Sequence, residues 1–368
     1  MIAMMNGSPY PVRIGKLRQL LEQVQADAVI VTSAANLFYF TGVWIEAHER
    51  LTALVVRREE DAFLIAPDLH RGEFGSLGME TLFWRDGEDA PALLARGIAH
   101  ADVVGIDDSW PSGHLLRLMN HRPHVNWRSG TEMTGRLRMV KDRGELELIR
   151  KSAAVANRVM ESFQTYLRVG SSEEKLLDEL QELWRRERIR ELSFDPTVAA
   201  GANGANPHHA PGTAVVREGD FVIVDTGGKL DRYCSDMTRT FAVGGEPSAE
   251  QRDVYELVKE AHLAGLRAIR PGVTLSEIDR TVRAVIEEGG YGPYFIHRTG
   301  HGLGIDVHEE PSVQTGNGLP VEAGMVFSIE PGIYLPGKFG VRIEDIVIVT
   351  DDGGESVNAS VSKKLTVV

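Results

Sequence analysis

The stretch FVIVDTGGKLDRYCSDMTRTF, residues 221–241, holds two strand-like apolar runs, and an aspartate borders each of them. Pairing Asp225 with Asp236 centres a turn between Leu230 and Asp231, and a short polar connection of this kind is typical of a β-hairpin. The two carboxylates would then face each other at roughly 5 Å between Cβ atoms. Because like charges directly opposite destabilise a sheet, we expect a positive charge between them.

The same arrangement recurs further along the chain. Glu330 in VFSIEPG and Glu344 in GVRIEDIVIV are centred on Gly337, so a second hairpin with a wider loop would again bring two acids together. Between the two predicted hairpins lies TGHGLGIDVHEEP, residues 299–311, which contains His301. Four carboxylates and one imidazole therefore form a candidate site that is rich in oxygen.

Such a site suits metal ions. Four negative charges fit two divalent cations with a bridging hydroxide, and paired sites of this kind hold their metals ~3.5–4 Å apart. Hard oxygen ligands favour manganese, and zinc, cobalt or iron can also bind a mixed set of oxygen and nitrogen ligands. The sequence therefore predicts two divalent metal ions, with Mn²⁺ as the first choice.

Each residue also has an ordinary structural interpretation. An aspartate at a strand end is usually a turn former or a cap, and a single histidine such as His301 is more often packed or exposed than a ligand. Glu344 could form a structural ion pair with Arg342 or Lys338. Burying one unpaired carboxylate costs several kcal/mol, however, and this sequence does so four times. We therefore favour the metal site over five separate explanations.

The elements around these residues predict an α+β fold with two domains. Residues 1–135 alternate strands and helices and predict a small α/β domain, residues 136–144 a linker, and residues 145–368 the larger domain. In the larger domain, helices are expected on one face of an antiparallel sheet. Three capping boxes predict helix starts there, at Ser171 with Glu174, Ser248 with Gln251, and Thr274 with Glu277.

Composition excludes several classes of protein. The net charge of −13 argues against a nucleic-acid-binding surface. No apolar run approaches the ~18 residues of a membrane helix, and the first 17 residues lack the apolar core of a signal peptide. Cys234 is the only cysteine, which fits a reducing cytoplasm.

The motifs together resemble a known family. The ordered set VDTGGKLDRYCSDMTRTF, TGHGLGIDVHEEP, FSIEPGIY and GVRIEDIVIV is similar to the pita-bread metallopeptidases, which include methionine aminopeptidase, aminopeptidase P and prolidase. The resemblance spans about residues 145–365. The N-terminal half resembles, less specifically, the creatinase-type domain of the proline-specific branch, a domain that methionine aminopeptidases commonly lack.

Carried over by position, the resemblance implies roles for individual residues. Asp236 and Glu344 would bridge two metal ions, and Glu330 would also carry a proton to the leaving nitrogen. His208 lies seventeen residues before Asp225, the spacing of the family, so it is preferred to His209 as a catalytic imidazole. The full implied set comprises metal ligands Asp225, Asp236, His301, Glu330 and Glu344, catalytic residues His208, His308 and Glu330, and substrate-binding residues His297, Tyr334 and Arg342.

The implied reaction is hydrolysis of the Xaa-Pro peptide bond by a metal-bridging hydroxide, with His308 stabilising the developing oxyanion. An Xaa-Pro dipeptidase (prolidase) is favoured. Aminopeptidase P, which acts on longer Xaa-Pro peptides, is the first alternative, and a non-catalytic binding protein on the same fold is the second. The resemblance also implies a homodimer and a peptide substrate with proline at its second position.

A dipeptidase must recognise the C-terminal carboxylate of its substrate, and a guanidinium suits a carboxylate best. We hypothesise that Arg50, in TGVWIEAHERL, reaches the active site from its own or a partner subunit. The alternative is a surface ion pair of Arg50 with Glu46 or Glu49.

Overall fold

A computed structural model describes residues 8–368 of the chain, so the first 17 residues, which lack the apolar core of a signal peptide, lie partly outside the described residues. The chain divides into two units, Met1–Arg138 and Met139–Val368, and each is described by itself. Most of the segment predicted as a linker, residues 136–144, is helical. Helix α6 (Thr131–Met139) continues into it, and α7 (Arg143–Phe163) begins two residues before the predicted start because Asp142 forms a capping box with Glu145.

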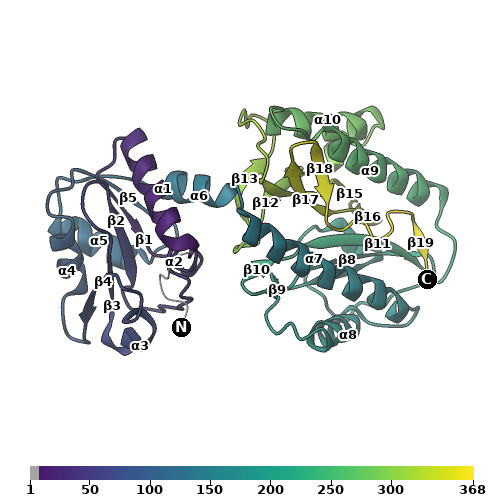
Figure 1. The fold of residues 1–368 in the computed structure, drawn as a ribbon. Helices are drawn as coiled ribbons and strands as arrows, with labels where there is room; N and C mark the ends of the chain where they lie inside the picture. Colours follow the sequence, from purple (N-terminus) through teal and green to yellow (C-terminus); the bar gives the residue numbers. More distant parts are fainter. Residues whose placement is uncertain (1–7) are drawn as a thin grey trace. The chain divides into compact units, whose positions relative to one another are not determined.

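The first unit is an α/β sandwich built on one six-stranded sheet (Figure 1), as the sequence predicted. Strands β2 and β3 form an antiparallel hairpin, whereas β3–β4, β1–β5 and β5–β6 are parallel pairs. The sheet order is β4-β3-β2-β1-β5-β6, with strands β1 (Ala28–Val31), β2 (Ala53–Arg57), β3 (Phe63–Pro67), β4 (Glu80–Trp84), β5 (Val103–Ile106) and β6 (Asn126–Ser129). Its helices are α1 (Pro9–Gln23), α2 (Ala34–Thr41), α3 (Arg71–Phe74), α4 (Ala90–Gly97) and α5 (Ser112–His121).

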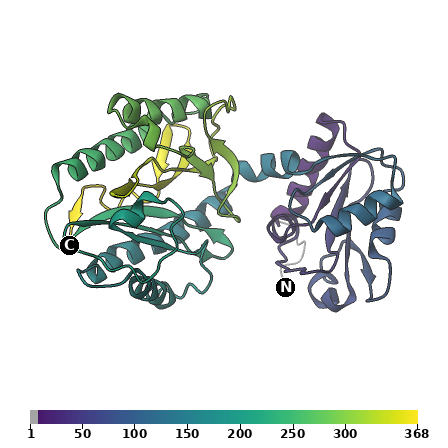
Figure 2. The ribbon, with the colours of Figure 1, turned by 180° about the vertical axis from the view of Figure 1, so that it is seen from behind.

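The second unit contains two main sheets (Figures 1 and 2). The first has the order β19-β11-β8-β7, with β7 (Thr197–Ala200), β8 (Asp220–Thr226), β11 (Met237–Val243) and β19 (Thr366–Val367). The second has the order β13-β12-β14-β17-β18, with β12 (Gly300–Gly302), β13 (Glu309–Val313), β14 (Val326–Ile329), β17 (Asp345–Thr350) and β18 (Gly353–Ser356). Two short hairpins complete the unit, β9 (Lys229–Leu230) with β10 (Tyr233–Cys234) and β15 (Gly332–Leu335) with β16 (Phe339–Arg342).

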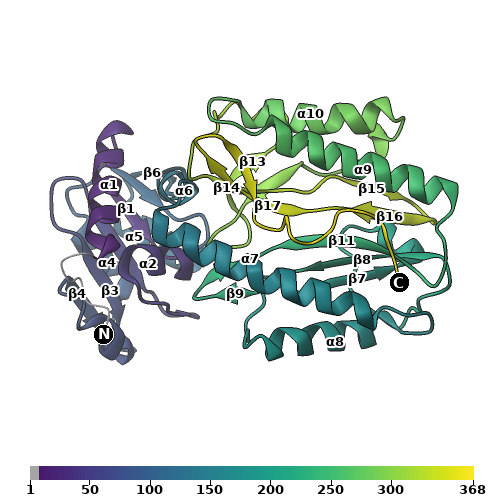
Figure 3. The ribbon, with the colours of Figure 1, turned by 45° about the vertical axis from the view of Figure 1, so that its right-hand side comes forward.

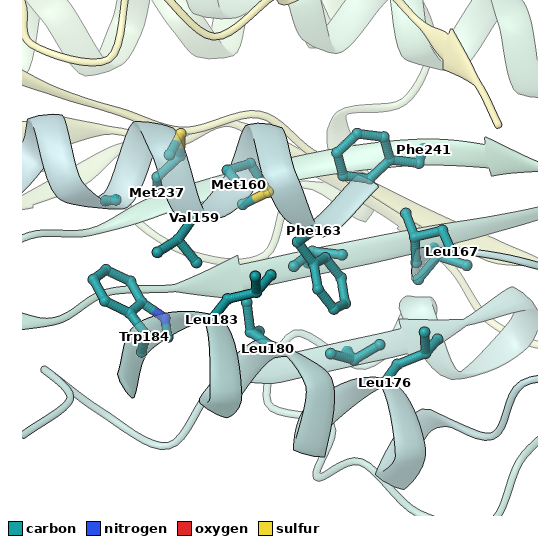
Figure 4. Close-up of a cluster of buried hydrophobic side chains, with 14 of the residues drawn as sticks. Val159, Met160, Phe163, Leu167, Leu176, Leu180, Leu183, Trp184, Met237 and Phe241 are labelled. Carbon is teal, nitrogen blue, oxygen red and sulfur yellow. The ribbon is translucent and has the colours of Figure 1, made fainter. Parts of the chain in front are cut away.

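Helices cover both sheets of this unit, so the prediction of helices on one face of one sheet was wrong. Helices α7 and α8 (Glu173–Arg186) pack on the first sheet, and α9 (Ala249–Ala268) and α10 (Leu275–Glu288) pack on the second, on the opposite side of the strands (Figure 3). The reason is that each sheet has its own apolar outer face. Figure 4 shows the first of these cores, which includes Phe163 of α7, Leu180 of α8 and Met237 of β11.

Helix starts follow two of the three predicted capping boxes, at Ser248 and Thr274. The third prediction was wrong by one residue, because Ser172 and not Ser171 caps α8. Ser172 forms an antiparallel bridge with Val215, and this extended backbone delays the start of the helix. In the part of the chain that the structure describes, no helix is both long and apolar enough to cross a bilayer.

Candidate metal centre and active site

Strand alternation brings the candidate ligands to one face. In β8, Val222 and Val224 point into the core under α7 and α8, so Asp225 points the other way. In β17, Val347 packs in the core under α9 and α10, and Glu344, three residues earlier, points to the opposite face. The inner faces of the two sheets therefore both present carboxylates to the same space.

The first predicted hairpin is present, but its register differs from the prediction. The turn is centred between Asp231 and Arg232, both with positive φ (48° and 74°), as a two-residue turn of type I′ requires. Asp225 consequently pairs with Thr238, and Asp236 is not directly opposite it. The shift is two residues along the strand, and side chains two residues apart share a face. Asp225 and Asp236 therefore remain diagonal neighbours on the same face.

The second hairpin has the predicted register. Gly332 pairs with Arg342 in β15–β16, and Ile329 pairs with Asp345 in β14–β17. Glu330 and Glu344 lie between these two ladders, so they are opposite each other, centred on Gly337 as predicted.

Asp236, His301 and Glu344 each offer one ligand atom, and these atoms all lie within 4.8 Å of one another. His301 Nε2 is 3.7 Å from Asp236 Oδ2 and 3.3 Å from Glu330 Oε1. Asp225 lines the same cavity. The structure thus brings all five predicted ligands to one place, from the two sheets.

Three carboxylate oxygens at this place are buried and have no hydrogen-bond partner among the described residues: Asp225 Oδ1, Asp236 Oδ1 and Glu344 Oε1. Burial raises the pKa of Asp236 and that of Glu344 well above the usual carboxyl range, and the neighbouring carboxylates raise both further. Burial likewise raises the pKa of Glu330. Unpaired buried oxygens crowded by like charge fit a bound cation, which would supply the missing partner.

His301 is suited to the same ion. Burial lowers the pKa of its imidazole to about 4, so the ring is neutral at neutral pH, and the neutral ring is the form that binds metals. Its Nδ1 is 3.1 Å from the carbonyl oxygen of Gly302, a contact that places the proton on Nδ1 and leaves Nε2 free to act as a ligand.

Neither alternative ion pair of Glu344 is formed. Arg342 donates to Asp225 Oδ2 at 2.6 Å, and Lys338 donates to Glu250. Arg342 is therefore the positive charge expected beside the first pair of acids. Glu344 Oε2 accepts a hydrogen bond from Thr238 Oγ1 at 2.7 Å.

A chain of hydrogen bonds leads from Arg342 to His297. Arg342 Nη1 donates to the Tyr334 hydroxyl at 3.0 Å, and that hydroxyl is 2.8 Å from His297 Nε2. His297 Nδ1 donates to the Arg298 carbonyl at 2.7 Å, so Nε2 of a neutral ring is the acceptor for Tyr334. Burial lowers the pKa of His297, consistent with this neutral tautomer.

The five carboxylate and imidazole ligands open onto a cavity of about 690 Å³. His308 stands edge-on to His301, with ring centroids 4.2 Å apart, and burial lowers its pKa to about 4. His208 and His297 also line this cavity, whereas Tyr334 lies behind Arg342 and is 2% exposed. Further lining residues are Phe194, Asp195, Thr197, Asn206, Pro207, Ile296, Arg298 and Val307.

Arg50 belongs to the other unit. Its guanidinium makes the alternative ion pair with Glu49 and a two-point contact with Asp86, at 3.2 and 3.0 Å. Its role in substrate binding therefore remains a prediction.

Three polar residues of the site were missed in the sequence. Thr238 and Ser328 each hold one carboxylate oxygen, and strand alternation was the available signal, because Ser328 lies two residues before Glu330 on the same face. Arg298 lines the cavity and donates to Ser312. Arg298 lies in an irregular segment before β12, and no periodicity there indicates which way a side chain points.

Comparison with known proteins identifies the family of the chain. The model of metallopeptidase family M24 matches residues 147–351, and that of the creatinase/prolidase N-terminal domain matches residues 13–140. A probable dipeptidase PepE of Mycobacterium bovis is 40% identical over 337 residues, which are 90% of this chain and 89% of that protein.

Two solved structures are similar over the whole chain. A prolidase from Thermococcus sibiricus superposes with a TM-score of 0.93 at 37% identity, covering 99% of this chain and 100% of that one. An Xaa-Pro dipeptidase from Bacillus anthracis has a TM-score of 0.87 at 30% identity, covering 98% and 100%. The chain is a metallopeptidase of family M24, and it belongs to the proline-specific branch of the pita-bread metallopeptidases.

Proposed function

We propose that this metallopeptidase hydrolyses the Xaa-Pro bond of dipeptides. The observation that carries the proposal is the set of three unpartnered carboxylate oxygens beside His301, at the base of a cavity lined by His208, His297 and His308. The similarity to a prolidase and to an Xaa-Pro dipeptidase supports proline at the second position of the substrate.

The charges support two metal ions. Among the described residues, Arg342 is the arginine that forms an ion pair with one of the four carboxylates. Three negative charges therefore remain without an ion-pair partner, and one divalent ion would leave these ligands negative. Asp225, Asp236, His301, Glu330 and Glu344 would hold the pair. We propose manganese because most of the donor atoms are hard oxygens. When bound, the ions supply Lewis acidity and a water molecule of lowered pKa as the nucleophile.

His308 would stabilise the oxyanion. Because its pKa is lowered to about 4, the ring is neutral at pH 7, and one ring N–H is available to donate to the scissile carbonyl oxygen as negative charge develops there. His208, which faces the same cavity, is proposed as a second donor to the substrate backbone.

Glu330 would carry the proton. Ser328 Oγ donates to Glu330 Oε1 at 3.0 Å, so Oε2 remains to accept a proton and deliver it to the leaving nitrogen. Burial raises the pKa of this carboxyl, which makes it a better base than an exposed glutamate. When the leaving nitrogen belongs to proline it has no N–H in the peptide bond, so the donated proton is needed for departure.

The proline ring would pack against the wall formed by His297 and His208, and Tyr334 would hold His297 in its neutral tautomer. The terminal carboxylate of a dipeptide needs a cation. We propose Arg50 for this role, and Arg298 is a second candidate because it lines the cavity. Arg342 donates to Asp225 Oδ2, so it would position this ligand carboxylate. It also lines the cavity, and its contact with the substrate is proposed as well.

Substrate length separates the two enzyme candidates. We expect efficient cleavage of Met-Pro and poor cleavage of Met-Pro-Ala, whereas an aminopeptidase P would prefer the tripeptide. Arg50→Ala and Arg298→Ala should each be assayed on both peptides. Loss confined to the dipeptide identifies the carboxylate-binding arginine, and equal losses on both peptides would eliminate that residue from the role.

Metal removal tests the reaction itself. Treatment with a chelator should abolish hydrolysis, and add-back of Mn²⁺ should restore it better than Zn²⁺ or Co²⁺, with two metal equivalents bound by elemental analysis. A protein that binds no metal and cleaves none of these peptides would instead be the non-catalytic binding protein.

We also propose a cytoplasmic homodimer. The single cysteine, Cys234, is buried and unpaired, which fits a reducing compartment, and the homodimer rests on family resemblance alone. Sedimentation equilibrium would measure the mass, and a monomer at micromolar concentration would contradict this assignment.

A further inference from the structure

Glu173, at the start of α8, is fully buried and accepts four hydrogen bonds. Its Oε1 accepts from Ala200 N at 2.8 Å and from Asn203 Nδ2 at 2.9 Å. Its Oε2 accepts from His209 Nε2 at 2.7 Å and from Gly212 N at 3.1 Å. All four donors belong to one segment, residues 200–212, so a single carboxylate ties both ends and the middle of this loop together.

His208 lies within that loop and lines the cavity. No side chain among the described residues hydrogen-bonds to its ring, and its backbone amide donates to Asn206 Oδ1 at 3.1 Å. The position of His208 therefore depends on the backbone that carries it. The adjacent His209 points to Glu173 instead of the cavity, and its side chain is 18% exposed.

The other side of the loop has little freedom. A Cβ atom added to Gly340 would lie 1.9 Å from Gly204 O, so the backbone of the loop touches β16 directly, two residues before Arg342. Glu173 holds the loop from one side, and β16 supports it from the other.

We propose that Glu173 and His209 are positioning residues, which fix the loop so that the His208 ring faces the substrate. This inference rests on the proposed function, in which His208 touches the substrate. The competing explanation is that Glu173 only stabilises the N-terminus of α8 as an acidic residue in the first turn. Glu174 occupies the same turn, is exposed, and is a matched control for that effect.

The test compares Glu173→Gln, Glu174→Gln and His209→Ala with the wild type, alone and combined with His208→Ala. A displacement of about 1 Å can cost ~100-fold in rate, so we expect Glu173→Gln and His209→Ala to lower kcat/KM at least tenfold, with bound metal unchanged. Glu174→Gln should have no such effect. His209→Gln keeps a donor near the position of Nε2 and should recover most of the activity.

The double variants decide the matter. If Glu173 acts through His208, then Glu173→Gln causes no further loss once His208 is alanine. Losses that multiply in the double variant would overturn the proposal, as would equal losses in Glu173→Gln and Glu174→Gln. Should Glu173→Gln fail to fold, the same comparison holds for His209→Ala.

Hydrogen exchange provides a readout that does not depend on activity. We expect faster amide exchange over residues 200–212 in Glu173→Gln than in Glu174→Gln, and equal rates would overturn the role of Glu173 in holding the loop. A wild-type protein that cleaves no Xaa-Pro peptide, in the presence of this exchange difference, would contradict the proposed function and leave the loop assignment standing.

Discussion

Three carboxylates of the site each accept a hydrogen bond from a neighbouring side chain through one oxygen, and the other oxygen of each accepts none from the described side chains. Asp225 is held through Oδ2 by Arg342, Glu344 through Oε2 by Thr238, and Glu330 through Oε1 by Ser328. Such outer partners orient a ligand before the ion arrives and reduce the entropy lost on binding. Substitution of these partners should therefore weaken metal affinity without removing any ligand.

We expect His308→Ala to lower kcat by about 10²–10³-fold, the usual effect of losing one oxyanion donor, with little change in KM. The reason is that the contact strengthens only as charge develops. Steady-state kinetics on an Xaa-Pro dipeptide measure this, and His308→Gln, which retains an N–H donor, is the control. A rise in KM at constant kcat would show that His308 only binds substrate.

We expect Asp236→Asn to change stability in opposite directions with and without metal. In the metal-free protein the pKa of Asp236 is raised by burial and by the nearby carboxylates, so its ionised form opposes folding. This cost grows as the pH rises from the unfolded pKa of ~3.9 to the raised folded pKa, and it is complete above the folded pKa. At pH 8 with chelator, Asp236→Asn should melt at a higher temperature than the wild type.

With saturating Mn²⁺ the order should reverse, because the substitution removes a ligand and metal binding stabilises only the folded state. Thermal denaturation under both conditions is the measurement. A variant that is less stable in both would show that Asp236 is structurally necessary without an ion.

The strands show why the site could be predicted from the sequence although one register was wrong. Asp225 and Asp236 were expected to be directly opposite, and the turn lies one residue further along than predicted. A turn displaced by one residue shifts the pairing by two, which preserves the face of every side chain. Prediction of the ligand set was therefore insensitive to this error.

Gly227 lies opposite Asp236 in this hairpin, and a Cβ atom there would be 1.9 Å from Ser235 O. We expect Gly227→Ala to lower stability by about 1–3 kcal/mol through overpacking and to reduce bound metal, because both aspartates flank the displaced backbone. Chemical denaturation and elemental analysis measure these effects. Gly318→Ala, where a Cβ atom meets nothing within 4 Å, is the control, and equal stability of the two variants would contradict this expectation.

Other elements depended on contacts distant in sequence and could not be predicted. The start of α8 moved from Ser171 to Ser172 because of a bridge to Val215, more than forty residues away. Tyr334 was expected to bind substrate, but its hydroxyl contacts Arg342 and His297, and Tyr334 does not line the cavity. Local periodicity predicts the face of a strand to which a side chain points, but it does not predict which residues pack on that face.

The larger unit as a whole carries a buried histidine that should set its acid stability. His262 of α9 is fully buried, its Nε2 is 3.8 Å from Asp345 Oδ2, and Lys363 and Arg239 lie around the same carboxylate. Burial lowers the pKa of His262 to about 4. Since the unfolded value is ~6.5, the unfolded chain takes up the proton first as the pH falls.

The contribution of His262 to the free energy of unfolding is thus fully present above pH ~6.5 and is lost as the pH falls towards ~4. At ~1.4 kcal/mol per pH unit, the loss over this range is roughly 3 kcal/mol. We expect His262→Leu to flatten the fall in unfolding free energy over this range. Denaturant midpoints between pH 4 and 7 are the measurement, with the exposed His124→Leu as control. Parallel curves for wild type and His262→Leu would contradict the assignment.

The two sheets contribute unequal shares of the ligands, with two aspartates from the first and a histidine and two glutamates from the second. The connection 244–248 joins β11 to α9, is exposed at residues 244, 246 and 248, and contributes no ligand. Severing the chain there would produce two fragments, each with an incomplete coordination set, whose reassembly should be strengthened by manganese and reversed by chelation. The fold therefore has the layout of a split reporter, in which complementation of the fragments would report the concentration of free ion.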